Sequence, residues 1–387
     1  MIFEESRRLK ELPPYLFAEI DKIIQKKRSD GIDVISLGIG DPDIPTPDGI
    51  IKELQKEAKN PQNHQYPSSY GMDSFKRSVA DYYMRRFRVS IDPETEVIPL
   101  FGTKEGIANI AYVYIDNGDY VLIPDPSYPV YTIGTMFAGG LTYTMPMEEK
   151  NDYIIDLYKI DAKIAKKAKI MHINYPNNPT SAICGMNFFE RVVEFAKKNN
   201  IIVCHDNAYA DTYFGEKKPH SFLNAKGAKE VGIEFYSLSK TFNMTGWRIG
   251  CAVGNKDIIA SLGKYKTNVD SGVFNAVQYA AATALRDYEK YSSNNNLIYK
   301  KRREITTSIL DDIGIDYYRS NATIYIWAKV PQNHSSKSFA QLVLDKADVV
   351  ITPGSAYGKH GEGYFRISLT IEDSRLKEAL ERIKNAL

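Results

Sequence analysis

Short apolar runs alternate with longer amphipathic segments along the middle of the chain. The apolar runs cover residues 97–101, 120–124, 170–174, 201–206 and 234–237. The segments between them are long enough for helices, as at residues 188–199. Strands that alternate with helices predict an α/β fold, in which a mostly parallel sheet carries helices on both faces.

The pattern changes after Val273. A long helical stretch is followed by two strand-like runs, residues 323–328 and 364–370, and then by a helix over residues 373–386. This order predicts a second, smaller α+β domain. We therefore expect an N-terminal arm that includes part of the small domain (1–45), a large domain (46–275) and a small C-terminal domain (276–387).

Composition narrows the classes of function. The chain has 387 residues with 50 Lys and Arg against 48 Asp and Glu, a formal charge of +2. Such a balance argues against a nucleic-acid surface and favours small-molecule partners. The six histidines show no ligand spacing, so we expect no metal.

The cysteines and the N-terminus indicate a compartment. Cys184, Cys204 and Cys251 lie far apart in apolar stretches, which is typical of buried free thiols in a reducing cytoplasm. The first residues carry charges where a signal peptide needs an apolar run, and no stretch approaches the length of a membrane span. We expect a cytoplasmic protein.

Polar residues gather where the predicted strands end. In a mostly parallel sheet, ligands bind beyond the carboxyl ends of the strands. The residues at these ends are Gly102, Thr103, Asn178, Asp206, Ser237, Ser239 and Lys240. We expect them to line one crevice.

Residues 237–250 combine groups that suit one ligand. They read SLSKTFNMTGWRIG and include Ser237, Ser239, Lys240 and Arg248. A lysine amine attacks an aldehyde once its ammonium is partly desolvated and its pKa falls, while hydroxyls and a guanidinium suit a phosphate. A phosphate ester that carries an aldehyde would use all four side chains.

Two further features fit such a ligand. Asp206 ends the apolar run IIVCHD, and a buried carboxylate needs a partner, either a protonated ring nitrogen or the helix end that Asp206 would cap at Asn207. Residues 101–106, FGTKEG, open a helix predicted over 105–114, whose N–H groups can meet a phosphate. The spacing of a nucleotide-binding P-loop is absent.

Together these motifs resemble the class I/II aminotransferases of the aspartate aminotransferase fold. The resemblance rests on NYPNNPT at residues 174–180, Asp206 with Tyr209, SLSK at 237–240, and Arg248, and it extends from LGIG at 37–40 to Arg366. It implies a pyridoxal 5′-phosphate (PLP)-dependent transferase fold, with PLP bound to the large domain. It also implies a homodimer with shared active sites and a ping-pong transfer of an amino group between an amino acid and a 2-oxo acid.

The resemblance implies roles for individual residues around the cofactor. Lys240 forms the Schiff base with PLP and moves the substrate's proton, and Asp206 pairs with the pyridine nitrogen. Asn178 and Tyr209 contact the phenolic oxygen, and Tyr128 stacks on the ring. The residues implied for the phosphate are Thr103, Lys104, Ser237, Ser239, Arg248 and, from the neighbouring subunit, Tyr66.

Three motifs narrow the resemblance to one group of aminotransferases and so indicate a substrate. LPPYLFAEI at 12–20, LGIGDPD at 37–43 and SKTFNMTGWR at 239–248 are similar to the LL-diaminopimelate aminotransferases, which exchange an amino group between LL-diaminopimelate and 2-oxoglutarate in lysine biosynthesis. Arg366 matches the arginine that binds the α-carboxylate; alone, it would be an ordinary strand arginine. The further residues implied for the substrate are Tyr15, Gly40, Lys104, Tyr128, Asn178 and Asn275.

Three alternatives stay open, and one position departs from the pattern. A broad aminotransferase for aspartate, alanine or aromatic donors would keep the same core motifs, and so would a PLP-dependent lyase. A regulator would need an added DNA-binding region, but only about 35 residues precede Gly38. The departure is Ser181, which stands where the class usually has glycine.

Overall fold

A seven-stranded sheet forms the centre of the computed structural model, which describes residues 3–12 and 16–387. Its strand order is β2-β8-β7-β6-β5-β3-β4. The strands are β2 (Val97–Leu100), β3 (Tyr120–Asp125), β4 (Leu141–Pro146), β5 (Ala168–Ile173), β6 (Ile202–Asp206), β7 (Gly232–Ser237) and β8 (Gly250–Gly254). Strand β8 pairs antiparallel with β2 and β7, and the other pairs are parallel. The predicted α/β fold with a mostly parallel sheet is confirmed.

Strands β4 and β8 were absent from the prediction, for two different reasons. Strand β4 lies at the edge of the sheet, and residues 141, 142 and 144 are exposed, so its sequence lacks a long apolar run. Strand β8 reads GCAVG, and its small residues give little strand signal. Both strands depend on pairing with neighbours that are far away in the sequence.

Both faces of the sheet are covered because side chains alternate along each strand. Leu122 packs in the cluster that contains Phe75 and Phe188, whereas Val121 packs with Ile107 on the other face. The helices of this region are α3 (Asp48–Ala58), α4 (Asp73–Phe87), α5 (Thr103–Tyr114), α6 (Val130–Phe137), α7 (Ala162–Ala165), α8 (Met186–Asn199), α9 (Ala228–Val231), α10 (Leu238–Thr241), α11 (Lys256–Lys266) and α12 (Asn275–Arg286). The helices predicted from residues 105 and 188 correspond to α5 and α8.

A smaller antiparallel sheet lies in the C-terminal part of the chain, in the order β11-β12-β9. It contains β9 (Tyr325–Lys329), β11 (Thr352–Pro353) and β12 (Tyr364–Ser368), packed with α14 (Ser336–Ala347) and α15 (Asp373–Ala386). Arg366 of β12 pairs with Trp327 of β9. Helix α15 matches the helix predicted over 373–386.

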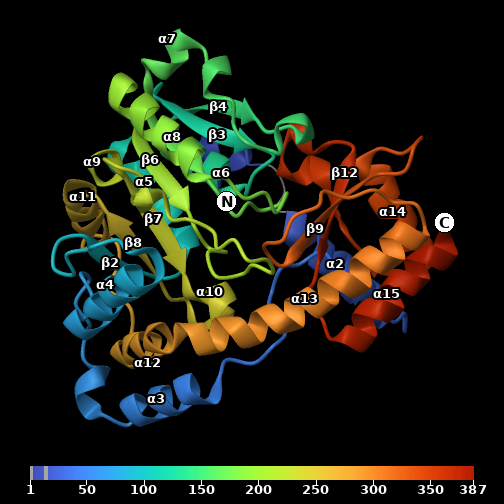
Figure 1. Ribbon diagram of the computed structural model, residues 1–387, viewed down its shortest axis with the longest axis horizontal. Coiled ribbons are helices and arrows are strands. Elements are labelled where there is room, and N and C mark those ends of the chain that lie inside the picture. The colour runs from blue at the N-terminus through green and yellow to red at the C-terminus, as the bar shows by residue number, and fades with distance from the viewer. Residues whose placement is uncertain (1–2, 13–15) are drawn as a thin grey trace.

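Two elements connect the regions. Strand β1 (Ile35–Ser36) pairs parallel with β10 (Val349–Val350), so the N-terminal segment joins the C-terminal part. Helix α13 (Tyr288–Asp312) runs from beside α12 to the C-terminal elements, as Figure 1 shows. Helix α12 itself packs on α3 and α4. The predicted boundaries at residues 45 and 275 stay a prediction.

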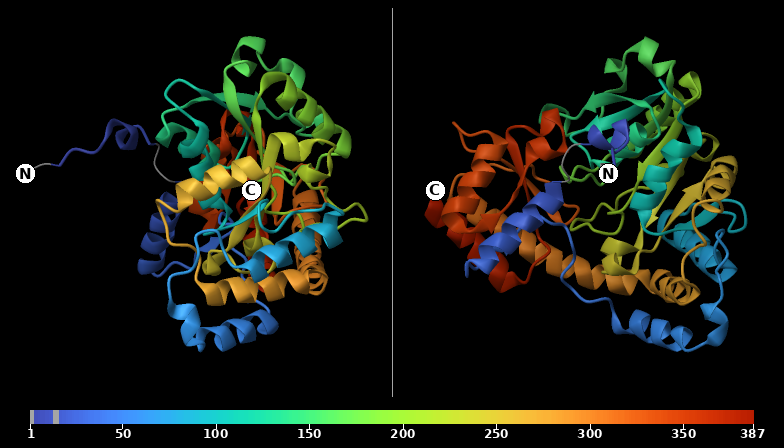
Figure 2. Two further views of the ribbon diagram at one scale, coloured as in Figure 1. Left: turned by 90° about the vertical axis from the view of Figure 1, so that its left-hand side faces the viewer. Right: turned by 180° about the vertical axis from the view of Figure 1, so that it is seen from behind.

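The first described residues project outward (Figure 2), although the Arg8 guanidinium donates to the Phe137 carbonyl at 3.3 Å. They contain α1 (Arg7–Lys10), and residues 3–11 are all exposed; α2 (Leu16–Ser29) follows. Within the described residues, no helix is long and apolar enough to cross a membrane.

Candidate active site

Lys240 lies directly beyond the carboxyl end of β7. It belongs to α10, a single turn that begins where β7 ends, and Ser237 caps that turn by accepting a hydrogen bond from the N–H of Ser239 at 3.2 Å. The Lys240 Nζ donates to the carbonyl oxygen of Gly40 at 2.6 Å. Burial lowers the pKa of the Lys240 ammonium below its usual value, which favours the neutral amine that a nucleophile or a base requires.

Asp206 lies at the carboxyl end of β6, and only one of its two carboxylate oxygens has a hydrogen-bond partner. Its Oδ2 accepts a hydrogen bond from the hydroxyl of Tyr131 at 2.8 Å, while its buried Oδ1 has no hydrogen-bond partner. Burial raises the pKa of Asp206 to about 6, and the Tyr131 hydrogen bond opposes that rise. Residues 207–211 contain no helix, so helix capping does not explain this carboxylate.

Arg366 is a buried cation with a defined set of contacts. Its side chain on β12 is 1% exposed. Its Nη1 donates to Asn178 Oδ1 and its Nη2 donates to the Gly38 carbonyl, both at 2.7 Å. Its Nε is buried without a partner. The interpretation of Arg366 as a strand arginine with its head in water is therefore wrong, and the guanidinium is held beside the predicted cofactor residue Asn178.

Tyr209 and Gly40 meet a residue that sequence reasoning missed. The hydroxyl of Tyr209 lies 2.9 Å from the hydroxyl of Tyr325 on β9. A Cβ at Gly40 would lie 2.0 Å from that same Tyr325 hydroxyl, so only glycine fits at this close approach. The ring of Tyr325 also lies under Arg366, whose Cζ is 3.9 Å from the ring centroid.

Two of the expected phosphate residues, Thr103 and Arg248, lie at the N-terminus of α5. Thr103 is buried at the first turn of this helix, and Gly102 precedes it with φ 75°. The Arg248 guanidinium donates to the Phe101 carbonyl at 3.3 Å. A Cβ at Gly102 would lie 2.4 Å from Arg248 Nη2. Helical N–H groups and a guanidinium at one point suit an anion.

Other predicted residues lie at the edge of this group or outside it. Tyr128 is half-buried and contacts the Tyr131 ring edge-on at 6.1 Å between centroids, and Lys104 is exposed on α5. Tyr66 is 91% exposed, and Asn275 begins α12. Tyr15 lies outside the described residues.

Ser181 adopts the backbone conformation that glycine favours, with φ 66°. Its buried hydroxyl lies 2.6 Å from the Thr323 hydroxyl and donates to the Tyr325 carbonyl at 3.0 Å. Two hydrogen bonds thus accompany a backbone conformation that costs a non-glycine residue about 1 kcal/mol. The departure from glycine keeps the turn and ties the loop that carries Asn178 to β9.

Two residues of the site were missed, although the sequence holds a partial signal for each. Tyr131 follows Tyr128 by three residues, which places both rings on one side of a helical turn. Tyr325 precedes Trp327 by two residues on β9, so the two side chains share a face, and Trp327 pairs with Arg366. That signal requires the register between β9 and β12.

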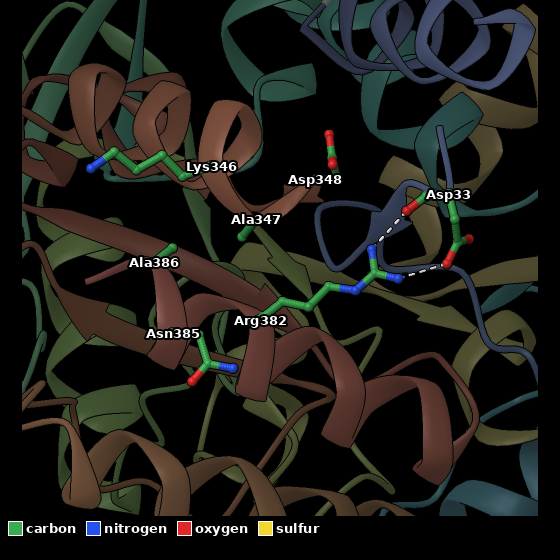
Figure 3. A pocket seen from close by; sticks show the side chains of 7 residues that line it. All are labelled: Asp33, Lys346, Ala347, Asp348, Arg382, Asn385 and Ala386. Carbon is green, nitrogen blue, oxygen red and sulfur yellow. Dashed lines mark hydrogen bonds and ion pairs between the residues drawn. The ribbon is translucent and has the colours of Figure 1, made fainter. Parts of the chain in front are cut away.

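A surface pocket lies apart from this group. Figure 3 shows its lining, and none of the lining residues is among the predicted site residues. Arg382 Nη2 and Asp33 Oδ2 form an ion pair at 2.7 Å within it. The pocket is lined by Asp33, Lys346, Ala347, Asp348, Arg382, Asn385 and Ala386. Its guanidinium is already neutralised by acidic side chains.

Comparison with known proteins gives matches along the whole chain. The sequence profile of the family "Aminotransferase class I and II" matches residues 32–383. The LL-diaminopimelate aminotransferase of Desulforudis audaxviator is 53% identical over 387 residues, covering 100% of this chain and 99% of that protein. The enzyme of the same name from Aquifex aeolicus is 54% identical over 384 residues, with 99% of each chain covered.

Solved structures show the same architecture. Substrate-bound BacF from Bacillus subtilis superposes with a TM-score of 0.96 at 36% identity, covering 99% of this chain and 98% of BacF. A variant of Thermus thermophilus aspartate aminotransferase gives a TM-score of 0.92 at 23% identity, with both chains fully covered. The second likeness concerns the fold alone.

Proposed function

The chain belongs to the aminotransferase class I and II family, and we propose that it transfers an amino group between LL-diaminopimelate and 2-oxoglutarate, in lysine biosynthesis. One observation carries the choice of substrate. Relatives named for LL-diaminopimelate are 53% and 54% identical to this chain over nearly all of its length. That identity spans every element that contributes to the site.

Enzymes of this family depend on PLP, and PLP is the cofactor of this chain. The residues present suit it. The buried Oδ1 of Asp206 lacks a partner, and a protonated ring nitrogen would supply one. When bound, PLP supplies an aldehyde carbon that takes the amino group and a ring that draws electrons from the substrate's α-carbon. The residues that would hold the phosphate are Thr103, Lys104, Ser237, Ser239 and Arg248, and those around the ring are Tyr128, Asn178 and Tyr209.

Three side chains of the site have separate proposed roles in proton transfer, carboxylate binding and charge stabilisation. Lys240 Nζ, with its lowered pKa, takes the proton from the substrate's α-carbon and later returns one. The Arg366 guanidinium binds the α-carboxylate, because its Nε has no partner and its two terminal nitrogens donate to neutral oxygens that a carboxylate can replace. Asp206 keeps negative charge beside the ring.

A direct test compares donors. LL-diaminopimelate, glutamate, aspartate, alanine and phenylalanine are added separately to PLP-loaded protein, and the loss of visible absorption is recorded. We expect LL-diaminopimelate and glutamate to remove the band at the lowest concentrations. Aspartate or phenylalanine acting at tenfold lower concentration than LL-diaminopimelate would contradict the proposed substrate. Lys240→Ala provides the control for a band that depends on this lysine.

We propose a homodimer in which each subunit contributes to the partner's site. The support is a set of exposed apolar side chains on neighbouring segments, Tyr66 (91% exposed), Tyr70 (47%), Val269 (60%) and Phe274 (40%). Their segments are in contact, because His64 packs edge-on against Phe274 at 6.2 Å and Ser69 donates to the Asp270 carbonyl. Apolar surface of this kind is typical of interfaces.

Subunit mixing tests the shared site. Tyr66→Phe protein is mixed with an excess of Lys240→Ala protein at limiting PLP, so that each subunit with Lys240 has a partner with Tyr66. We expect the activity per Tyr66→Phe subunit to rise about tenfold, the value of a hydrogen bond to a charged phosphate. An excess of the double variant Lys240→Ala/Tyr66→Phe is the matched control. A rise with that control, or none with either protein, would contradict the proposal.

We propose a cytoplasmic location as well. Cys184, Cys204 and Cys251 are free and buried. Unpaired thiols are typical of a reducing compartment. Cell fractionation followed by an immunoblot checks this expectation.

A further inference from the structure

Tyr325 contacts several groups of the site, although no motif identified it. Its side chain is 3% exposed. Its hydroxyl lies 2.9 Å from that of Tyr209, and its ring lies 3.9 Å from the Cζ of Arg366. Its hydroxyl also approaches Gly40, whose carbonyl accepts the hydrogen bond from Lys240. One side chain therefore lies between the predicted cofactor residues and the predicted carboxylate ligand.

We propose that Tyr325 is a positioning residue with two separable effects: its ring orients the Arg366 guanidinium for the substrate carboxylate, and its hydroxyl directs the Tyr209 proton toward the cofactor's phenolic oxygen. The proposal rests on the proposed function, since it takes Arg366 and Tyr209 as the groups that meet substrate and cofactor. It adds a residue that the family motifs do not contain.

The hydroxyl effect follows from counting protons. Two tyrosine hydroxyls 2.9 Å apart share one hydrogen bond, so one donates and the other accepts. If Tyr209 donates to the phenolic oxygen, its own oxygen must accept from Tyr325. Burial raises the pKa of the Tyr209 hydroxyl well above its usual value, so Tyr209 keeps the proton that it donates. Hydrogen bonds in such a chain strengthen one another.

The ring effect follows from the shape of the guanidinium. A planar cation that stacks on an aromatic face keeps its N–H groups directed outward along its edge. Two of these groups of Arg366 donate to Asn178 and Gly38, and Nε has no partner. The ring of Tyr357, 5.0 Å from the Arg366 Cζ, adds a second aromatic contact. The carboxylate-binding edge is thus set before substrate arrives.

The backbone of Tyr325 is fixed to the loop that carries Asn178. Its carbonyl accepts from the Ser181 hydroxyl at 3.0 Å, and its N–H donates to the Thr323 hydroxyl oxygen at 3.1 Å. The Thr323 N–H in turn donates to the Thr212 carbonyl at 2.9 Å. These bonds join the start of β9 to the cofactor side of the site, so the ring and hydroxyl have a defined position.

Two variants separate the effects. Tyr325→Phe keeps the ring and removes the hydroxyl, whereas Tyr325→Leu removes both. The first measurement is the pH midpoint of the visible band of PLP-loaded protein. The second is the Kd of glutarate, a dicarboxylate that cannot react, by calorimetry. Both measurements are independent of turnover and of the identity of the amino donor.

We expect Tyr325→Phe to raise the pH midpoint by about half a unit, because weaker donation from Tyr209 leaves more negative charge beside the Lys240 nitrogen, which then holds its proton to higher pH. Its glutarate Kd should stay within about twofold. Tyr325→Leu should shift the midpoint similarly and raise the glutarate Kd about tenfold, because the cation–π contact is lost.

Tyr299→Phe is the matched control, since the Tyr299 hydroxyl is buried without a partner. This variant should change neither the pH midpoint nor the glutarate Kd.

An unshifted midpoint in Tyr325→Phe, or an unchanged glutarate Kd in folded Tyr325→Leu, would overturn the corresponding half of the proposal. If Tyr325→Leu fails to fold, Tyr325→Phe still tests the hydroxyl effect. Tyr325→His then takes the place of Tyr325→Leu as the test of the ring effect. Because histidine keeps an aromatic ring, we expect a smaller rise in the glutarate Kd than for Tyr325→Leu. A normal band with no response to LL-diaminopimelate would contradict the proposed donor alone. A wild-type protein without any band would overturn both.

Discussion

The two sides of the candidate site are built differently. On one side Asp206 and Arg366 are 6% and 1% exposed, and their contacts are complete within one chain except where a ligand would bind. On the other side Tyr66 is 91% exposed. The groups proposed for the chemistry are therefore prearranged within one chain, whereas the proposed phosphate contact from Tyr66 would require a second copy of the chain. Substitutions on the two sides should therefore fail in different ways.

The largest loss is expected from Lys240→Arg, which keeps the charge but removes the primary amine. Turnover should fall by roughly 10⁴-fold or more, because the proposed covalent attachment and the proposed proton transfer both use this amine. Single-turnover kinetics with LL-diaminopimelate measures the loss. Residual activity within tenfold of wild type would show that another base does the work. Far-UV circular dichroism controls for folding.

Asp206→Asn should lower kcat by roughly 10²- to 10³-fold, since the neutral amide does not stabilise a protonated ring nitrogen. The Tyr131 hydrogen bond has an oxygen to accept it in either residue, so the fold should remain. Steady-state kinetics in the presence of saturating PLP checks this. A kcat within threefold of wild type would remove Asp206 from the site.

Wild type and Asp206→Asn, both without cofactor, also test how the stability of the fold depends on pH. The pKa of Asp206 is raised to about 6 from 3.8, so the folded protein binds this proton more readily than the unfolded chain. Stability through this group is therefore lower above pH 6 and is regained as the pH falls toward 4. Relative to Asp206→Asn, the free energy of unfolding of the wild type should rise by up to about 3 kcal/mol over that window. Urea unfolding of both cofactor-free proteins measures it, and a constant difference would contradict the prediction.

Tyr66→Phe tests the exposed side. We expect the Kd for PLP to rise about tenfold, with little change in kcat at saturating PLP, because only one hydrogen bond to the phosphate is lost. Titration of cofactor-free protein with PLP provides the measurement. A large fall in kcat with unchanged PLP affinity would show that the two sides do not differ as described.

The smallest effect is expected at Ser181. Ser181→Gly relieves the left-handed backbone but loses the hydrogen bonds to Thr323 and Tyr325, so stability should change by less than about 1 kcal/mol. Ser181→Ala keeps the strained backbone and loses the same bonds, and should cost about 1 to 2 kcal/mol. Thermal unfolding of both variants measures the difference. Equal stabilities would show that the backbone conformation carries no cost here.

The place of the candidate cofactor residues at the strand ends was predictable, because they lie in short motifs that directly follow apolar runs. Lys240 and Asp206 each follow an apolar run, and parallel strands bring such ends together. Tyr325 could not be predicted in this way, because its role depends on the register of β9 with β12 and on the approach of a segment some 285 residues earlier. Strands β4 and β8 were not predicted for a related reason. Their own residues give a weak strand signal, and they form by pairing with strands that are distant in the sequence.

The close approach of Gly40 to Tyr325 has a consequence for how this sequence can vary. A Cβ at residue 40 would overlap the phenol oxygen at 2.0 Å and the ring carbons Cε1 and Cζ at 2.7 Å. A side chain can therefore enter at 40 only together with a smaller residue at 325. That exchange would remove the nearer of the two aromatic rings that contact the guanidinium of Arg366. A library that varies residue 40 alone should therefore recover only glycine, whereas a library that varies 40 and 325 together reaches combinations that a single substitution at 40 cannot.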